Sequence, residues 1–169
     1  MANSLSIRAS SATDASAVDK LLEASYPALM ARAYDVPTLS AALPLMTKAD
    51  PALLTSMTYY VAERAGGELV GCGGWTKARP GSGDIVTGLG HLRHFGTHPD
   101  CIGQGIGRAL FTRCKENAAQ YGVTRFECYA SRNAEGFYRA LGFQVVAPLD
   151  VEFGAGVTFP STLMDYDFN

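Results

Sequence analysis

The sequence predicts an α/β (α+β) fold with one domain over residues 1–169, in which helices flank a mixed, mostly antiparallel sheet of about seven strands. Three observations support this class. A length of 169 residues suits one domain better than two. Two strand-like runs joined at Gly66-Gly67 predict an antiparallel hairpin. Further along, a strand, a glycine-rich turn, an amphipathic helix and another strand predict a right-handed β-α-β crossover, which adds a parallel pair.

Two helical regions are expected after a short first strand at residues 5–9. The first region carries apolar residues at 3.6-residue spacing, and three residues offer N-caps for it: Ser11, Thr13 and Asp14. Pro27 is expected to end or kink this helix, because proline lacks the backbone N–H that a helix needs. Residues 36–55 contain three more prolines and therefore predict short, irregular helices.

The remaining elements complete the sheet. Strand patterns cover residues 58–64, 68–77, 85–97, 124–130, 143–151 and 157–168. Residues 105–121 form the clearest helix, because apolar residues lie on one stripe and charged residues away from it. A short helix over residues 134–141 is expected to stop at Gly142.

Composition excludes several classes of function. Hydrophobic residues make up 47% and charged residues 18% of the chain, so it is expected to fold throughout. A net charge of -2, with no run of five like charges, gives no surface suited to nucleic acid or to a membrane. No apolar stretch reaches the roughly 20 residues that cross a bilayer. We expect a cytoplasmic protein whose partner is a small molecule or a peptide, and the sequence leaves a homodimer open.

The glycine-rich turn is the most informative segment. Gly103, Gly105 and Gly107 occupy alternate positions where a helix begins, so backbone N–H groups can approach an anion closely. A pyrophosphate suits such a site, because the positive end of the helix dipole favours negative charge, and a side chain at Gly105 or Gly107 is expected to enter it. The spacing fits neither G-x-x-x-x-G-K-[ST] nor G-x-G-x-x-G, which disfavours a P-loop or a dinucleotide fingerprint. A glycine-rich turn that binds no ligand remains the alternative.

Two segments, the turn with Gly105 and Gly107 and the run from Asn133 to Phe143, resemble the GNAT superfamily of N-acetyltransferases. Gly105 and Gly107 match the glycines of its cofactor motif (Arg or Gln, two residues, Gly, one residue, then Gly or Ala), although Ile102 stands at the leading Arg/Gln position. The run from Asn133 to Phe143 resembles the family's Asn-x-x-x-x-Phe/Leu-Tyr-x-x-x-Gly-Phe signature. The resemblance implies a GNAT fold with a splayed central strand pair and acetyl-CoA in the cleft between those strands.

The resemblance also implies which residues bind the cofactor. They are Phe95, Thr97, Ile102, Gly103, Gln104, Gly105, Ile106, Gly107, Arg108, Asn133 and Tyr138. Tyr138 resembles the family's general acid, which protonates the leaving thiolate; its alternative role is a core tyrosine. Asn133 resembles the residue that contacts the pantetheine arm, and its alternative role is a helix N-cap.

The reaction needs a base, because an amine is mostly protonated at neutral pH. Counted back from the glycine pair, His91 falls where some family members carry a catalytic Glu and others a His, and it would give the rate an acidic limb near pH 6.5. Strand alternation gives His91 the facing of Arg93, Phe95 and Thr97, and turns His94 to the other side. The alternative is a half-buried histidine bonded to a neighbour. Because the three histidines of this region cannot converge on one ion in a strand, we expect no metal.

The acceptor is expected between the region after the first strand and the last strand pair, as in this family. Those regions contribute Tyr26, Tyr34, Asp150 and Glu152. The two carboxylates could attract a cationic amine or could simply form a solvated face. We therefore predict an enzyme that transfers an acetyl group from acetyl-CoA to a primary amine of a small molecule or peptide, by direct attack in a ternary complex. The alternatives are a catalytically silent acyl-CoA-binding module and a flavin- or nucleotide-binding regulator.

Overall fold

The computed structural model describes residues 4–169, and its sheet confirms the predicted fold class. The seven strands are β1 (Leu5–Ala9), β2 (Tyr59–Arg64), β3 (Leu69–Thr76), β4 (Leu89–Thr97), β5 (Arg125–Ser131), β6 (Gln144–Glu152) and β7 (Thr158–Asp167). They lie in the order β1-β2-β3-β4-β5-β7-β6. Every pair in the sheet is antiparallel except β4 and β5, which are parallel.

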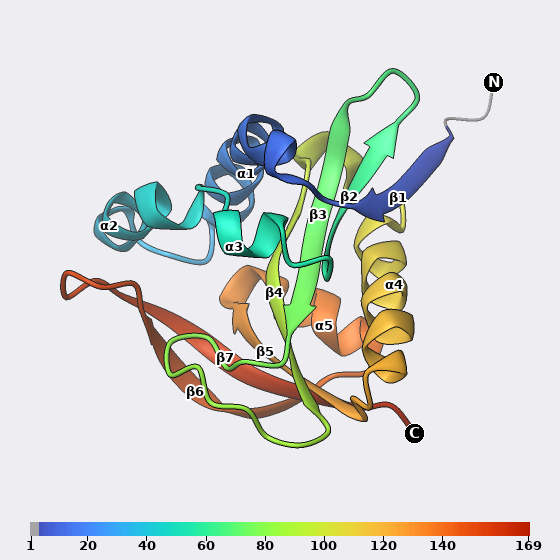
Figure 1. Cartoon of the computed structure of the whole chain (residues 1–169). Coiled ribbons are helices and arrows are strands. Elements are labelled where there is room, and N and C mark those ends of the chain that lie inside the picture. The colour runs from blue at the N-terminus through green and yellow to red at the C-terminus, as the bar shows by residue number, and fades with distance from the viewer. Residues whose placement is uncertain (1–3) are drawn as a thin grey trace.

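Helices cover both faces of the sheet (Figure 1). They are α1 (Ala15–Met30), α2 (Val36–Met46), α3 (Pro51–Leu54), α4 (Ile106–Gln120) and α5 (Glu135–Leu141), with 3-10 turns η1 (Ala12–Asp14), η2 (Pro99–Cys101) and η3 (Arg132–Ala134). One apolar core lies under α4 and α5, and a second lies under α1, α2 and α3. No helix within residues 4–169 is long and apolar enough to cross a bilayer.

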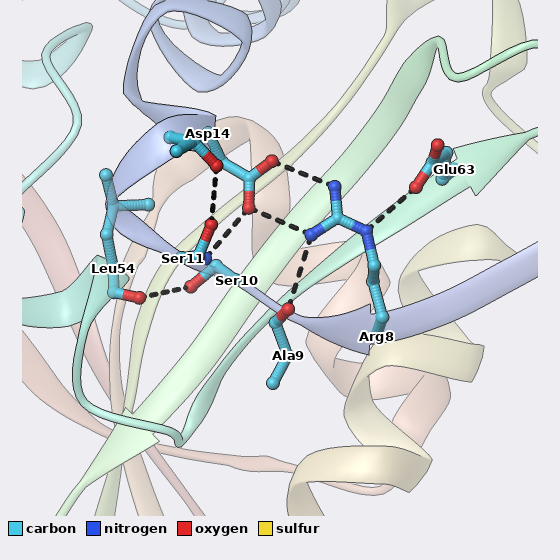
Figure 2. A network of polar contacts seen from close by, with 8 residues as sticks. Arg8, Ala9, Ser10, Ser11, Asp14, Leu54 and Glu63 are labelled. Atoms are coloured by element: carbon cyan, nitrogen blue, oxygen red, sulfur yellow. Dashed lines mark hydrogen bonds and ion pairs between the residues drawn. The ribbon is translucent and has the colours of Figure 1, made fainter.

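An ion-pair network fixes the start of α1 (Figure 2). The Arg8 guanidinium donates two hydrogen bonds to the Asp14 carboxylate, at 2.8 and 2.9 Å, and a third to Glu63 at 2.8 Å. Asp14 also accepts the backbone N–H of Ser11 at 2.8 Å, so one carboxylate joins β1 to the helix start. These bonds, above all those from Arg8, lower the pKa of Asp14.

Two boundaries differ from the sequence expectations. The first helix runs through Pro27 and ends at Met30, so the proline does not end it. The fourth strand begins at Leu89 rather than at residue 85, and Ile85 forms only an isolated bridge with Ala78. Residues 77–88 therefore form a long connection, whose glycines at 81, 83 and 88 adopt positive φ.

The sheet splays where its parallel pair ends. Strands β4 and β5 are paired only from Leu89↔Arg125 to His91↔Glu127, whereas β5 stays paired with β7 as far as Ser131. Beyond His91, where β4 is still paired with β3 but no longer with β5, three carbonyls of β4 accept hydrogen bonds from side chains. The donors are Tyr59 Oη to His94 O (2.8 Å), Tyr26 Oη to Phe95 O (2.7 Å) and Ser25 Oγ to Thr97 O (2.6 Å). Side chains from α1 and β2 thus hold the splayed edge in place.

A β-bulge interrupts β4 next to this opening. The register runs Gly74↔Arg93 and then Cys72↔Gly96, so Gly73 alone stands opposite His94 and Phe95. His94 adopts a left-handed φ of 54°, which is uncommon outside glycine. A Cβ on Gly73 would lie 2.6 Å from the Phe95 ring, so this position suits only glycine.

The bulge reverses the side-chain alternation of β4. The His94 ring lies 6.0 Å from that of Tyr26, on the α1 side, whereas Phe95 packs against the core under α4. The prediction that His91 shares its facing with Phe95 and Thr97 was therefore wrong, and so was the prediction that His94 points to the opposite side. One extra residue in the strand explains both errors.

Candidate active site

A cavity of about 710 Å³ occupies the opening between β4 and β5. On the α4 side, its lining includes the glycine turn and the side chains of Phe95, Ile106 and Tyr138. On the α1 side, the lining includes Tyr26, His94, Arg93, Asp50 and Tyr129. One continuous space therefore joins a helix N-terminus on one face of the sheet to a polar region on the other face.

Ten of the eleven predicted cofactor residues line this cavity. They are Phe95, Thr97, Ile102, Gly103, Gly105, Ile106, Gly107, Arg108, Asn133 and Tyr138. Gln104 does not: its amide oxygen accepts from Arg64 (3.2 Å) and its amide nitrogen donates to the Asp100 carbonyl (3.4 Å) on the outer side of the turn. Its side chain is occupied away from the cavity.

The glycines of the turn have different roles. Gly105 is the N-cap of the 15-residue helix α4 and has a φ of 80°, and a Cβ there would meet nothing within 4 Å. The first N–H groups of α4 lack helical partners, so they are available to a ligand in that open space. Gly107 instead packs against α5, because a Cβ there would lie 2.7 Å from the Phe137 ring. The expectation that a side chain at either glycine enters the anion site therefore fails for Gly107.

Tyr138 presents a free hydroxyl to the cavity. Its ring is only 7% exposed and packs edge-on against Phe137 and Phe143. Its Oη makes no hydrogen bond with any residue from 4 to 169, yet it is not among the buried atoms without a partner, so it is accessible from the cavity. Burial raises the pKa of Tyr138 well above its usual value of 10, which keeps the hydroxyl protonated at neutral pH.

Asn133 is exposed at the cavity wall and caps no helix. The N-caps of η3 and α5 are Ser131 and Ala134, and the Asn133 side chain has no hydrogen-bond partner among residues 4–169. The alternative role expected for it, as an N-cap, is therefore not what the structure shows. Its amide is free to bind a ligand.

His91 lies outside the cavity lining. It is 2% exposed, neither ring nitrogen has a hydrogen-bond partner, and its Nδ1 lies 3.8 Å from Glu127 Oε2. Burial lowers the pKa of His91 to about 4, and the charges of Arg79 and Arg93 act in the same direction. The acidic limb near pH 6.5 that we expected from this residue is therefore not supported.

His94, rather than His91, lines the cavity. Its Nε2 lies 2.7 Å from the carbonyl oxygen of Met46, which can only accept, so we assign the ring hydrogen to Nε2. Nδ1 is then the acceptor of the neutral ring; it has no partner among residues 4–169 and is not a buried atom. Burial lowers the pKa of His94, so the ring is neutral at pH 7.

Only one of the four predicted acceptor residues lines the cavity, namely Tyr26. Tyr34 stacks on Phe159 at 4.2 Å, and its hydroxyl donates to the Pro160 carbonyl (2.7 Å) and accepts the Arg132 N–H (2.8 Å). Asp150 and Glu152 are exposed on the outer face of β6, because strand alternation turns their neighbour Val151 to the cavity. The predicted pair of carboxylates does not face the acceptor.

Several residues of the α1 side were missed from the sequence, among them Arg93, Asp50 and Tyr129. Arg93 and Tyr129 stand on strands whose facing depends on a pairing or a bulge, and Asp50 lies in the segment between α2 and α3, so no local pattern marked them. Within residues 4–169, no group of three or more His, Cys, Asp or Glu side chains is arranged to hold a metal ion.

A comparison of sequences decides the family. The family described as "Acetyltransferase (GNAT) domain" matches residues 55–145, which is over half of the chain and contains β4, the glycine turn, α4 and the whole second signature. The chain belongs to the GNAT acetyltransferase family. The resemblance found in the sequence is thereby confirmed.

Curated relatives of this GNAT chain match it only in part. It is 37% identical over 73 residues to the mycothiol acetyltransferase of Kocuria rhizophila, an alignment that covers 41% of this chain and 24% of that protein. It is 32% identical over 103 residues to the mycothiol acetyltransferase of Saccharomonospora viridis, which covers 58% of this chain and 33% of that protein. The matched segment thus spans a quarter to a third of those relatives.

Solved structures match over nearly the whole chain. A GCN5-related N-acetyltransferase from Rhodopseudomonas palustris has a TM-score of 0.76 at 21% identity, covering 99% of this chain and 98% of that one. The PaiA N-acetyltransferase from Thermoplasma acidophilum, solved with coenzyme A, has a TM-score of 0.71 at 18% identity, covering 97% and 99%. YncA from Salmonella typhimurium, solved with acetyl-CoA, has a TM-score of 0.61 at 21% identity, covering 98% and 95%. At these identities the likeness establishes the GNAT fold.

Proposed function

We propose that this chain transfers an acetyl group from acetyl-CoA to the amine of a small-molecule or peptide acceptor. The observation that carries the proposal is the single cavity that runs from the glycine turn past the free Tyr138 hydroxyl to the α1 face of the sheet. A donor entering from one face can thus meet an acceptor entering from the other. Structures of two relatives contain coenzyme A or acetyl-CoA, which supports this donor.

The residues of the α4 side fit coenzyme A. The free N–H groups at the start of α4 suit its pyrophosphate, and the open space at Gly105 admits that group without a clash. Arg108 lines the same space, with its guanidinium held by the Ala140 carbonyl at 3.1 Å. The unpaired edge of β4 and the free amide of Asn133 suit the amide groups of the pantetheine arm. Acetyl-CoA supplies an acyl group that is activated as a thioester.

Tyr138 serves as the proton donor to the departing sulfur. Its hydroxyl is protonated, accessible and unshared, and its ring is fixed by aromatic neighbours. A donor held in this way needs no reorganisation when charge develops on the leaving group.

His94 serves as the proton acceptor for the amine, directly or through one water. The Met46 carbonyl holds the tautomer whose Nδ1 is free, and the lowered pKa keeps that nitrogen unprotonated at neutral pH. The charged and titratable groups around the ring are Asp19, Asp50, Arg93, Tyr26 and Tyr59. Burial outweighs the two carboxylates among them, because the net effect on the pKa of His94 is downward.

Direct attack in a ternary complex fits the state of the cysteines. All four are buried and none forms a disulfide. Cys101 and Cys128 line the cavity, and both are buried. Burial strongly raises the pKa of the Cys128 thiol, so Cys128 is held as the poorly nucleophilic thiol. A covalent acyl-enzyme would need an activated thiolate.

The test combines ligand protection with turnover. Acetyl-CoA should raise the melting temperature, by the equivalent of about 2.7 kcal/mol at a hundredfold excess over Kd, while NAD, FMN and ATP should not. Addition of an amine panel should then release free thiol from the acetyl-CoA complex. Protection without thiol release for any amine would favour the silent binding module. Protection by FMN or ATP would favour a nucleotide-binding regulator.

A further inference from the structure

Arg93 lies on the α1 side of the cavity without a counter-ion. No carboxylate of residues 4–169 lies within 4.0 Å of its guanidinium, and its one side-chain hydrogen bond goes to the hydroxyl of Thr76 at 3.1 Å. The guanidinium nitrogens that make no bond are absent from the buried atoms without a partner, so they are accessible. Since Arg93 lines the cavity, unused donors are available there.

The other cations of the cavity are already engaged. Lys48 pairs with Glu23 at 3.5 Å, and Arg108 is bound to the Ala140 carbonyl beside the glycine turn. Asp50 lies close enough to influence Arg93, but not within ion-pair distance, and its Oδ1 accepts the Ala52 N–H at 2.9 Å. Arg93 is therefore the cation on the α1 side of the cavity, within the described residues, that has no carboxylate partner.

Holding such a charge has a cost in free energy. Arg93 is about half-buried, and burial lowers its pKa, which shows that the surroundings disfavour the charged form. The guanidinium is a planar fork whose N–H donors match the two oxygens of a carboxylate. A ligand carboxylate would supply the missing charge and accept the unused hydrogen bonds.

The position of Arg93 limits the size of that ligand. Arg93 and His94 are consecutive, so their Cα atoms lie about 3.8 Å apart. The bulge turns both side chains to the α1 side of the sheet, where a regular strand would have separated them. An anion on Arg93 and an amine near Nδ1 of His94 can therefore belong to one small molecule.

We infer that the acceptor is a small amino acid-like molecule that carries a carboxylate near its amine, and that Arg93 binds the carboxylate. The inference rests on the proposed function, because it names the acceptor class of that transfer. Polycationic acceptors fit less well, since Arg93 would repel them and Asp50 is the one carboxylate among the described residues that lines the cavity, whereas Asp150 and Glu152 lie outside it.

The experiment compares amino acids with their carboxamides as acceptors, by thiol release from acetyl-CoA. The wild-type enzyme should favour the acid over its carboxamide in kcat/KM by about 10- to 100-fold, as expected for a charged hydrogen-bonded pair. The comparison is stringent, because the amine of a carboxamide is less basic and, without charge recognition, reacts more readily. Arg93→Gln should abolish the preference, mainly through KM for the acid, and Arg93→Lys should retain part of it.

Lys48→Gln is the matched control, because it removes a cavity cation that is already paired, and it should keep the preference. Melting curves with acetyl-CoA show for each variant whether the donor site is intact. Equal use of acid and carboxamide by a turning-over wild-type enzyme would overturn the inference and leave the proposed function standing, and so would a preference that survives in Arg93→Gln. If acetyl-CoA protects the protein but no acceptor causes thiol release, that result would contradict the proposed function and the inference together.

Discussion

The ring of Tyr138 packs against its aromatic neighbours, but its hydroxyl makes no hydrogen bond within residues 4–169. Removing the hydroxyl therefore tests its role in proton transfer without disturbing the packing. Tyr138→Phe keeps the ring contacts with Phe137 and Phe143 but deletes the proton. We expect kcat to fall by roughly 10²- to 10⁴-fold, the usual size of a general acid effect, with little change in Kd for acetyl-CoA. Steady-state kinetics and calorimetric titration measure the two quantities.

Tyr34→Phe is the matched control for that variant. The Tyr34 hydroxyl lies outside the cavity and is engaged with Pro160 and Arg132. Its removal deletes two hydrogen bonds, so it should cost roughly 1–3 kcal/mol of stability and leave kcat unchanged. A Tyr138→Phe enzyme with the wild-type kcat would make Tyr138 a packing residue.

His91 and His94 both lie on β4, but only His94 lines the cavity. If His94 accepts the amine's proton, kcat must fall as pH decreases through the pKa of His94, because the protonated ring cannot act as a base. That pKa is lowered by burial, so the acidic limb should lie below pH 6.5. His94→Gln, which can keep a bond to the Met46 carbonyl, should lower kcat by roughly 10²- to 10⁴-fold and remove the limb.

His91→Leu serves as the counterpart, since the His91 ring touches no cavity surface. We expect it to keep both the rate and the limb of the wild-type enzyme in the same pH series. A His91→Leu enzyme that loses the limb, beside a His94→Gln enzyme that keeps it, would return the proton acceptor to His91. If neither variant moves the limb, the amine reaches the site already deprotonated.

At the scale of elements, the two ends of α4 offer a controlled test of the anion site. A Cβ added at Gly105 or at Gly122 would meet nothing within 4 Å, and the two glycines have left-handed φ values of 80° and 79°. An aspartate at either position therefore meets the same backbone strain. Gly105→Asp should abolish acetyl-CoA binding by placing a carboxylate at the anion site, whereas Gly122→Asp, at the opposite helix end, should bind normally. Calorimetric titration measures the affinity of both variants for acetyl-CoA. Equal affinity in the two variants would show that the glycine turn is not part of the cofactor site.

The elements themselves were largely predictable because their signals are local. Alternation, helical spacing and the glycine turn lie within single segments, and they placed all seven strands. The two motifs of the family resemblance pointed to ten residues that line the cavity. The facing of side chains was less predictable. The bulge at His94 arises because Gly73, on the neighbouring strand β3, allows the Phe95 ring to fill its place. Because the bulge depends on residues of both β3 and β4, it cannot be predicted from the sequence pattern of either strand alone.

The acceptor side illustrates the same limit on a larger scale. Lys48 and Asp50 reach the cavity from the segment between α2 and α3, where prolines remove any periodic pattern. Asp150 and Glu152 looked suitable as carboxylates, but the register of β6 against β7 turns them outward. Charge and spacing can suggest an acceptor site, whereas only the assembled sheet shows which charges face it.

For the whole molecule, His91 lies where the two parts of the sheet are joined. The β4–β5 ladder has three residue pairs and joins two parts of the sheet: β1, β2, β3 and β4 on one side, and β5, β7 and β6 on the other. His91 forms the last of these pairs, with Glu127. Its buried ring faces Arg79, Arg93 and Glu127, and Glu127 is already shared with Arg79 (3.8 Å) and Arg125 (3.4 Å). Burial, together with the charges of Arg79 and Arg93, lowers the pKa of His91 to about 4, and Glu127 does not offset these effects.

This arrangement makes global stability depend on pH. Between pH 6.5 and about 4 the unfolded chain binds a proton at His91 and the folded protein does not, so the free energy of unfolding must decrease as pH falls through this window. At about 1.4 kcal/mol per pKa unit, the full loss is roughly 3 kcal/mol, and above pH 6.5 none of it occurs. His91→Leu should remove this part of the dependence and leave the part due to His94. Because it also removes two ring nitrogens without partners, the variant should be at least as stable as the wild type at pH 7.5. Urea unfolding from pH 4.5 to 7.5 measures both effects, and a His91→Leu protein with the full wild-type slope would show that His91 gains a compensating partner when it is protonated.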